Sequence, residues 1–291
     1  MALSYFAVRS LELLSLSSPV QCPVVLDGRI AQNTTLSVFD TNASPFNPGY
    51  SKGQNLSWSQ ILEFPPVAPS LFDASSPESF KPLEVTIDDR SIFNPSGTNP
   101  QLGFRRAGLL LGNGSDASNQ GVMTFHWSSK QDSARPLNLT HEYLTVWHET
   151  NDSSGSQFAL QLGLPLGSND TSEASSHSWK MLDRNNSVVF TSPLNFDEWQ
   201  NFAVTVDVPQ NTIQVYFSEG SSPLEAVTEV LQNDNSGGGA LQIGLLKKPT
   251  ETKTVVFDGF QESPLNEGQI YGGLFVEDSA DNCVSLGTAK A

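Results

Sequence analysis

The stretch QNFAVTVDVPQNTIQVYFS (residues 200–218) shows most directly how this chain folds. In both of its halves, apolar side chains take every second position: Phe202, Val204, Val206 and Val208, then Ile213, Val215 and Phe217. Successive side chains of a β-strand point to opposite faces, so a period of two predicts strands with one buried face. The stretch therefore predicts two half-buried β-strands.

Further strand-like segments, each bounded by turn residues, recur along the chain. We expect strands at residues 82–88, 104–111, 121–130, 141–149, 157–164, 178–183, 187–192, 200–208, 212–218, 240–248 and 273–279. Only SPLEAVTEVLQND (222–234) favours a short helix. Many strands at regular spacing with little helix predict an all-β sandwich of two antiparallel sheets, most simply a β-jelly roll with one or two short helices.

The composition agrees with a turn-rich β protein. Of the 291 residues, 37% are hydrophobic and only 16% are charged. The net charge of −16 argues against a nucleic-acid partner, whose phosphates need Lys and Arg. The acidity is compatible with a neutral polysaccharide partner and equally with solubility alone. No run of about 18 apolar residues is present, so we expect no membrane span.

One domain is expected over residues 22–286, because the Ser- and Gly-rich pieces between its apolar runs are short loops. Residues 1–21 are similar to a secretion signal, although Arg9 and Glu12 interrupt the apolar region. Residues 287–291 form a tail. Acceptor sequons for N-glycosylation lie at Asn33, Asn42, Asn55, Asn113, Asn138, Asn151, Asn169 and Asn185. These features predict a secreted, extracellular protein.

The two cysteines, Cys22 and Cys283, lie near the two ends of the chain. A redox motif or metal site would need closer spacing or neighbouring histidines. In an oxidising compartment this pair predicts a disulfide that ties the ends together; the alternative is two buried free thiols. We expect no metal and no cofactor.

The stretch THEYLTVWHETND (140–152) concentrates side chains with functional chemistry. Alternation predicts that Glu142, Leu144, Val146 and His148 face the core. The opposite face is then aromatic and polar throughout, with His141, Tyr143, Thr145, Trp147 and Glu149. Aromatic rings stack on the CH face of a sugar, and carboxylate or imidazole groups bind its hydroxyls. The pattern predicts a sugar-binding face; the alternative is an exposed strand with scattered aromatic residues.

Glu149 is the leading catalytic candidate on this face. It lies two residues beyond Trp147, and a carboxylate beside an aromatic ring can have the raised pKa that a general acid needs. Arg106 shares a strand face with Gly108, and His126 lies in a polar stripe. Both would support Glu149 if their strands lie in the same sheet, although a lone histidine is more often structural.

Longer strings resemble glycoside hydrolase family 131. They include QCPVVLDGRI, KGQNLSWSQILEFP, KPLEVTIDDRSIF, GFRRAGL, KQDSARPLNLTHEYLTVWHETND and QESPLNEGQIYGGLFVEDS. The resemblance runs from about residue 20 to about residue 286. It implies a secreted fungal β-glucanase with a β-jelly-roll catalytic domain that cleaves β-1,3-, β-1,6- or β-1,4-linked glucan. We expect a monomer that acts on a β-glucan polysaccharide or oligosaccharide.

The resemblance also implies two active-site glutamates. One ends the strand EYLTVWHE and is Glu149; the other directly follows FRRA, where this chain has Gly108. The acids Glu84 and Asp88, which share one face of PLEVTID, are candidates for the missing carboxylate. Otherwise a histidine carries the proton, or the chain is a weakly active or non-hydrolytic glucan-binding paralogue.

A less favoured alternative is a jelly-roll polysaccharide lyase. In that case Arg106 would neutralise the carboxylate of a uronic acid, and Tyr143 or His126 would be the base. The strong acidity of the chain makes an anionic substrate less attractive.

Overall fold

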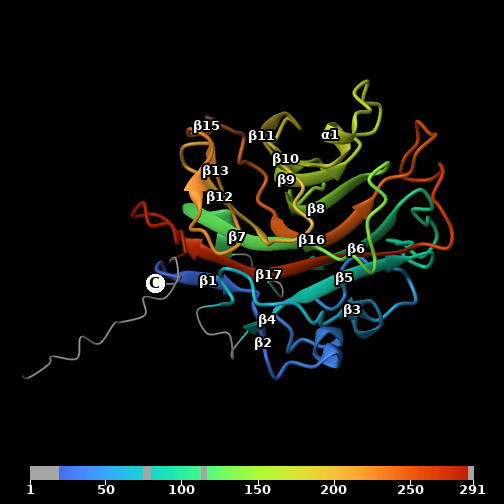
Figure 1. Ribbon diagram of the computed structural model, residues 1–291, viewed down its shortest axis with the longest axis horizontal. Coiled ribbons are helices and arrows are strands. Elements are labelled where there is room, and N and C mark those ends of the chain that lie inside the picture. Colours follow the sequence, from blue (N-terminus) through green and yellow to red (C-terminus); the bar gives the residue numbers. More distant parts are fainter. Residues whose placement is uncertain (1–19, 75–79, 113–116, 288–291) are drawn as a thin grey trace, which may run out of the picture.

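Two antiparallel sheets pack face to face in the computed structural model, which describes residues 20–74, 80–112 and 117–287. Figure 1 shows the two layers of strands, and a large apolar core lies between them. The expected all-β, jelly-roll-like sandwich is confirmed. The predicted signal segment up to residue 19, the tail from residue 288 and the sequon at Asn113 lie outside the described residues.

The larger sheet has nine strands in the order β14-β13-β12-β7-β17-β5-β3, with β1 paired to β17 and β15 paired to β13. Its strands are β1 (Val24–Asp27), β3 (Leu62–Glu63), β5 (Leu83–Asp88), β7 (Val122–Gln131), β12 (Gln200–Asp207), β13 (Thr212–Glu219), β14 (Glu225–Ala226), β15 (Leu231–Gln232) and β17 (Asn266–Asp278).

The smaller sheet has six strands in the order β11-β10-β9-β8-β16-β6. They are β6 (Arg105–Leu110), β8 (Glu142–Glu149), β9 (Ser156–Gly163), β10 (Ser178–Leu182), β11 (Val188–Pro193) and β16 (Ala240–Lys247). A two-stranded ladder joins β2 (Ile30–Ala31) to β4 (Phe80–Lys81). The helical elements are α1 (Glu173–Ser176) and the 3-10 turns η1 (Leu36–Asp40), η2 (Trp58–Gln60) and η3 (Ala117–Asn119).

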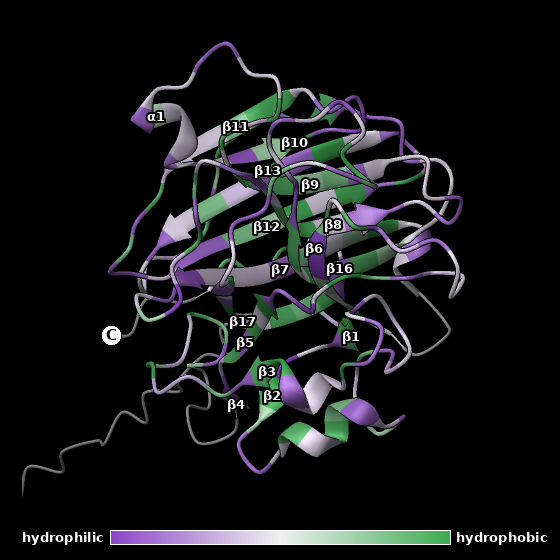
Figure 2. Ribbon diagram, turned by 90° about the vertical axis from the view of Figure 1, so that its right-hand side faces the viewer, coloured by the Kyte–Doolittle hydropathy of each residue, from purple (hydrophilic) through white to green (hydrophobic). Residues whose placement is uncertain are grey.

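Alternation along most strands places the core as predicted, and Figure 2 shows hydrophobic and hydrophilic residues following one another along them. In β12, Phe202, Val204 and Val206 are buried in the core. In β6, Ala107 and Leu109 are core residues, so Arg106 and Gly108 share the outer face of the six-stranded sheet. Where the pairing of strands is regular, a period of two in the sequence therefore correctly indicates which side chains face the core.

The predicted helix at residues 222–234 is wrong. This segment contains β14 and β15, which pair with the edge strand β13. Leu224 is buried, and Val227 and Leu231 pack against the main core. The spacing of Leu224, Val227 and Leu231 would also suit one face of a helix. The segment forms strands because the open edge of β13 offers unpaired backbone groups, which favour the addition of a strand.

A β-bulge at Thr145 interrupts the alternation in β8. The register between β8 and β9 shifts between Leu144 and Val146, and the register with β16 shifts at the same level. One extra residue in a strand moves all later side chains to the opposite face. Tyr143, before the bulge, and Val146, after it, both lie in the core. The predicted common face of Tyr143, Trp147 and Glu149 is therefore wrong.

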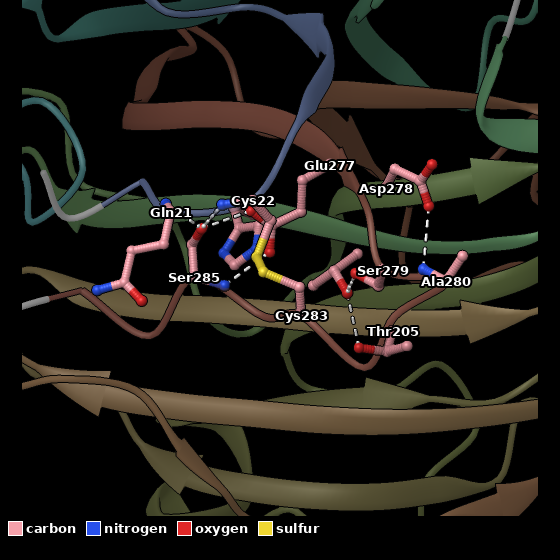
Figure 3. The surroundings of a disulfide bond; sticks show 11 residues. Gln21, Cys22, Thr205, Glu277, Asp278, Ser279, Ala280, Cys283 and Ser285 are labelled. Atoms are coloured by element: carbon pink, nitrogen blue, oxygen red, sulfur yellow. Dashed lines mark hydrogen bonds and ion pairs between the residues drawn. A yellow bond between two sulfur atoms is a disulfide. The ribbon is translucent and has the colours of Figure 1, made fainter.

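The predicted disulfide between Cys22 and Cys283 is confirmed. Figure 3 shows how Ser285 supports it: the hydroxyl accepts hydrogen bonds from the backbone N–H groups of Gln21 (2.8 Å) and Cys22 (3.2 Å). The same hydroxyl donates to Glu277 of β17 at 2.6 Å. Both ends of the domain are thereby joined to the nine-stranded sheet. In the described part of the chain, no helix has the length and apolar character needed to cross a membrane.

Candidate active site

A polar cluster surrounds Glu149 on the outer face of the six-stranded sheet. The carboxylate is partly exposed, and its Oε2 accepts a hydrogen bond of 2.5 Å from Nε2 of Gln242. The same Nε2 lies 3.3 Å from the hydroxyl of Tyr50. Arg106 carries a positive charge that interacts with both Glu149 and Tyr50. The structure thus brings together Glu149 and Arg106, as predicted, and adds Gln242 and Tyr50.

The strand order explains this convergence. Strand β16 lies between β8 and β6, so outward side chains of all three strands meet on one surface. Gln242 lies opposite Trp147 of β8, and Gly244 lies opposite Gly108 of β6. Leu241 and Ile243 belong to the core, so the intervening Gln242 must face outward.

The indole of Trp147 reaches across β16 to Gly108 of β6. A Cβ atom built on Gly108 would lie 3.3 Å from Cη2 of Trp147 and 3.1 Å from Oε1 of Gln242. The position that would carry a second carboxylate is therefore covered by these two side chains. Trp147 is only 3% exposed and packs with Phe104 and Leu246. It forms the floor of the site and leaves little open ring surface for sugar stacking.

Burial and charge determine the protonation of Tyr50 and Arg106. Burial raises the pKa of Tyr50, the negative charge of Glu149 raises it further, and Arg106 lowers it. Tyr50 therefore keeps its proton at neutral pH and remains a hydrogen-bond donor. Burial lowers the pKa of Arg106, whereas the negative charges of Glu149 and Tyr50 raise it. A guanidinium with an ordinary pKa above about 12 stays charged under these conditions.

The structure places His126 away from Glu149. His126 belongs to β7 in the nine-stranded sheet, so the premise that its strand lies beside β8 is wrong. Its side chain is fully buried on the outer side of that sheet, stacked on Phe275 with ring centroids 4.4 Å apart. Its Nε2 shares a hydrogen bond of 2.9 Å with Glu277. His126 therefore supports the region of the disulfide and cannot act beside Glu149.

Three other predicted sugar-binding residues are internal. Tyr143 is fully buried, and its hydroxyl lies 2.9 Å from Oε2 of Glu267. His141 pairs with Glu262 at 3.0 Å, before the start of β8. Thr145 is the bulge residue and is fully buried. None of the three lies in the cluster around Glu149, and the lyase alternative loses both of its candidate bases, because His126 is buried as well.

The candidate replacement acids are also misplaced. Glu84 and Asp88 lie on β5 in the nine-stranded sheet, on the side that faces away from the core. Glu84 is buried and paired with Arg135 at 2.7 Å, and Asp88 is paired with Arg90 at 2.6 Å. The core of the sandwich separates both acids from Glu149, so neither replaces the carboxylate missing at Gly108.

Gln242 and Tyr50 were not among the residues predicted from the sequence. The sequence does contain a signal for Gln242, because the alternation in ALQIGLLKK places it on the face opposite the core residues. Tyr50 lies in the irregular segment before η2, where no periodic pattern exists. Across residues 20–74, 80–112 and 117–287, no group of three or more His, Cys, Asp or Glu side chains is arranged to hold a metal ion.

The structure is thus a two-sheet β-sandwich with a carboxylate-centred polar site on the outer face of one sheet. The sequence matches the glycoside hydrolase 131 catalytic N-terminal domain over residues 24–282. The chain therefore belongs to glycoside hydrolase family 131, which confirms the resemblance in its strings and makes it a glycoside hydrolase by family. A search of curated proteins finds no match.

Two solved structures share the fold. The GH131 β-glucanase catalytic domain from Podospora anserina has a TM-score of 0.72 and 19% identity, covering 92% of this chain and 99% of that one. The catalytic domain of the glycoside hydrolase family 131 protein from Coprinopsis cinerea has a TM-score of 0.68 and 18% identity, covering 92% and 98%. At such identities the likeness concerns the fold alone.

Proposed function

We propose that this protein is a secreted, monomeric hydrolase of β-1,3-, β-1,6- or β-1,4-linked glucan. The observation that carries the proposal is the partly exposed carboxylate of Glu149, held by Gln242 beside Tyr50 and Arg106. The β-glucanase named for the similar Podospora anserina structure supports the substrate class. The net charge of −16 further favours a neutral polymer over an anionic one.

Glu149 is the group for acid/base chemistry at the glycosidic bond. In its protonated form it would give its proton to the leaving glycosidic oxygen as the C–O bond breaks, while the oxygen of a water molecule bonds to the anomeric carbon. That water releases one proton to the solvent, and the carboxylate of Glu149 takes up a proton from the solvent again. Gln242 orients the carboxylate through Nε2, and the protonated hydroxyl of Tyr50 is available to a sugar oxygen. Arg106 supplies a fixed positive charge beside the carboxylate.

The second candidate function is glucan binding with weak or no hydrolysis. Glycosidases of this mechanistic type use two carboxylates about 5–10 Å apart. On the neighbouring strands, the outward positions next to Trp147 are Gln242, Gly108 and Ala159, and none of the three bears a carboxylate. This specific observation favours a weakened enzyme over a fully active one.

A comparison of the wild type with Glu149→Gln tests the proposal. We expect the wild type to release reducing sugar from laminarin, pustulan or cellulosic glucan, and the variant to lose about 10²–10⁴-fold of that rate. Glu225→Gln, at an exposed position on β14, is the matched control and should behave as wild type. Equal activity of Glu149→Gln would contradict the role of Glu149. Retention on glucan without any sugar release by the wild type would establish the second function.

Secretion is supported by the disulfide and by exposed sequons. The asparagines of the described, exposed sequons are Asn33, Asn42, Asn55, Asn151, Asn169 and Asn185. Expression of the full chain in a eukaryotic host should yield protein in the medium whose mass falls on treatment with an endoglycosidase. Retention of an unglycosylated chain inside the cells would contradict secretion. Light scattering of the purified protein tests the monomer.

A further inference from the structure

A pocket lies on the side of the sandwich away from Glu149. It has a volume of about 250 Å³ and opens over β12, β13 and the segment that follows β17. Thr205 and Asp207 of β12 line it, while the intervening Val206 belongs to the core. The pocket is therefore on the outer face of the nine-stranded sheet, whereas Glu149 is on the outer face of the six-stranded one.

Polar groups without protein partners face this pocket. Asp207 uses Oδ1 to accept the backbone N–H of Gln210 at 2.8 Å, and its Oδ2 has no partner among the described residues. The hydroxyl of Thr212 and the side-chain amide of Asn282 likewise have no hydrogen bond within the described ranges. Together they offer a carboxylate oxygen, a hydroxyl and an amide to a ligand rich in hydroxyl groups.

An aromatic side chain and an aliphatic rim complete the lining. Tyr216 is partly buried against the small apolar cluster that contains Ala203, its partner on β12, and its hydroxyl donates to Oε1 of Gln214 at 2.9 Å, so the ring is held in place. Val230 is 60% exposed and also lines the pocket. A fixed ring beside polar groups suits a sugar, which offers an apolar CH face as well as hydroxyls.

The disulfide fixes the remaining wall. Asn282 and Val284 line the pocket on either side of Cys283, which is tied to Cys22. Figure 3 shows Thr205 and Ser279, two further lining residues, beside this bond. None of the lining residues is Lys or Arg, and Asp207 is an acid, so the pocket disfavours an anionic sugar.

We propose that this pocket is a second carbohydrate site that binds one glucosyl unit of a neutral β-glucan. The choice of sugar rests on the proposed function, whereas the existence of the site rests on the pocket itself. Its volume is slightly below the roughly 300 Å³ at which small-molecule sites commonly begin, so it suits a single sugar unit. A polymer bound there stays attached while Glu149 acts on another segment, which raises the effective concentration of substrate.

Retention on insoluble β-glucan tests the site in the Glu149→Gln protein, which leaves the polymer intact. Adding Tyr216→Ala or Asp207→Asn should weaken retention about tenfold, the effect of losing one charged hydrogen bond or one stacking contact. Gln210→Ala, on the adjacent turn and outside the lining, is the matched control and should not change retention. With Glu149 in place, the same pocket variants should cleave short soluble glucan oligosaccharides at the wild-type rate.

Asp207→Asn and Thr212→Val keep the test decisive if Tyr216→Ala does not fold, because both replacements preserve side-chain shape. Unchanged retention of these folded variants would overturn the second site, as would a wild type that binds no β-glucan. A failure of the proposed hydrolysis is distinguishable, since it appears as absent sugar release by the wild type and leaves the retention measurement unaffected.

Discussion

The hydroxyl of Tyr271 lies 2.8 Å from the carbonyl oxygen of Thr145, across the core of the sandwich. It also lies 2.6 Å from the carbonyl oxygen of Gly244. Tyr271 belongs to the nine-stranded sheet, whereas Thr145 and Gly244 lie where the β8–β16 ladder is interrupted. A bulge leaves backbone groups without ladder partners, and buried carbonyls need a donor. Tyr271 supplies that donor and thereby stabilises the bulge that turns Trp147 and Glu149 outward.

Tyr271→Phe is expected to destabilise the fold by about 1–3 kcal/mol, because it keeps the ring but removes the single O–H that the carbonyls of Thr145 and Gly244 share. Urea unfolding followed by tryptophan fluorescence measures the loss. Tyr216→Phe is the control: its hydroxyl bonds to Gln214 at the surface, so the change should be smaller. Equal losses in the two variants would show that the hydroxyl of Tyr271 does not support the bulge.

The same bulge marks where sequence reasoning about the site fails. Alternation correctly predicted the core face of β12 and the shared face of Arg106 and Gly108, because those ladders are regular. In β8 the extra residue at Thr145 reverses the faces, so Tyr143 is buried. The bulge depends on contacts with strands distant in sequence, and the local pattern of apolar residues does not encode it.

The sequence also did not reveal which of the two sheets each strand joins. A polar stripe in β7 suggested that His126 would lie beside Glu149, but only pairing distinguishes the two sheets, and β7 pairs with β12 and β17. Residues 222–234 show the same effect, since an open edge of β13 converts a possible helix into β14 and β15. Most of the long strands and the disulfide were predictable, whereas the assignment of strands to the two sheets was not.

Gly108→Glu is expected to increase hydrolysis, because it places a carboxylate beside Glu149. The backbone of Gly108 does not require glycine, but the new side chain must displace the ends of Gln242 and Trp147, which lie 3.1 and 3.3 Å from the added Cβ. Gly108→Gln is the matched control with the same shape and no charge. Reducing-sugar release that rises in the Glu variant alone supports the prediction. Similar rates in both variants would show that the missing carboxylate does not limit the reaction.

Gln242→Glu is expected to shift the pH–rate profile upward by about one unit or more. The replacement sets a second carboxylate where Nε2 now lies 2.5 Å from Glu149, and two close carboxylates cannot both ionise easily. The measurement is kcat/KM against pH on a soluble glucan. Gln210→Glu, an exposed change in the turn between β12 and β13, should leave the profile unchanged. If the pH–rate profile of Gln242→Glu is unshifted, residue 242 does not influence the protonation of the carboxylate that reacts.

Acid should destabilise the protein partly through Glu262. Burial raises the pKa of this carboxyl, but hydrogen bonds from Lys247 and Asn138 lower it more, from 4.5 to about 2. The folded state therefore binds fewer protons than the unfolded state between these values. The stabilising contribution is complete above about pH 5 and is lost as the pH falls towards 2. Burial raises the pKa of Glu267, the other partner of Lys247, so that residue contributes with the opposite sign.

Glu262→Gln isolates this contribution, because the amide is close in shape but does not titrate. Thermal unfolding at intervals from pH 6 to about pH 2 should show a shallower fall in Tm for the variant than for the wild type. The difference should shrink in high salt, since the side chain of Glu262 is 28% exposed and its charge is partly screened. Glu225→Gln should follow the wild-type curve, because that side chain is exposed. Parallel curves for Glu262→Gln and the wild type would show that the pairing of Glu262 with Lys247 does not cause the acid sensitivity.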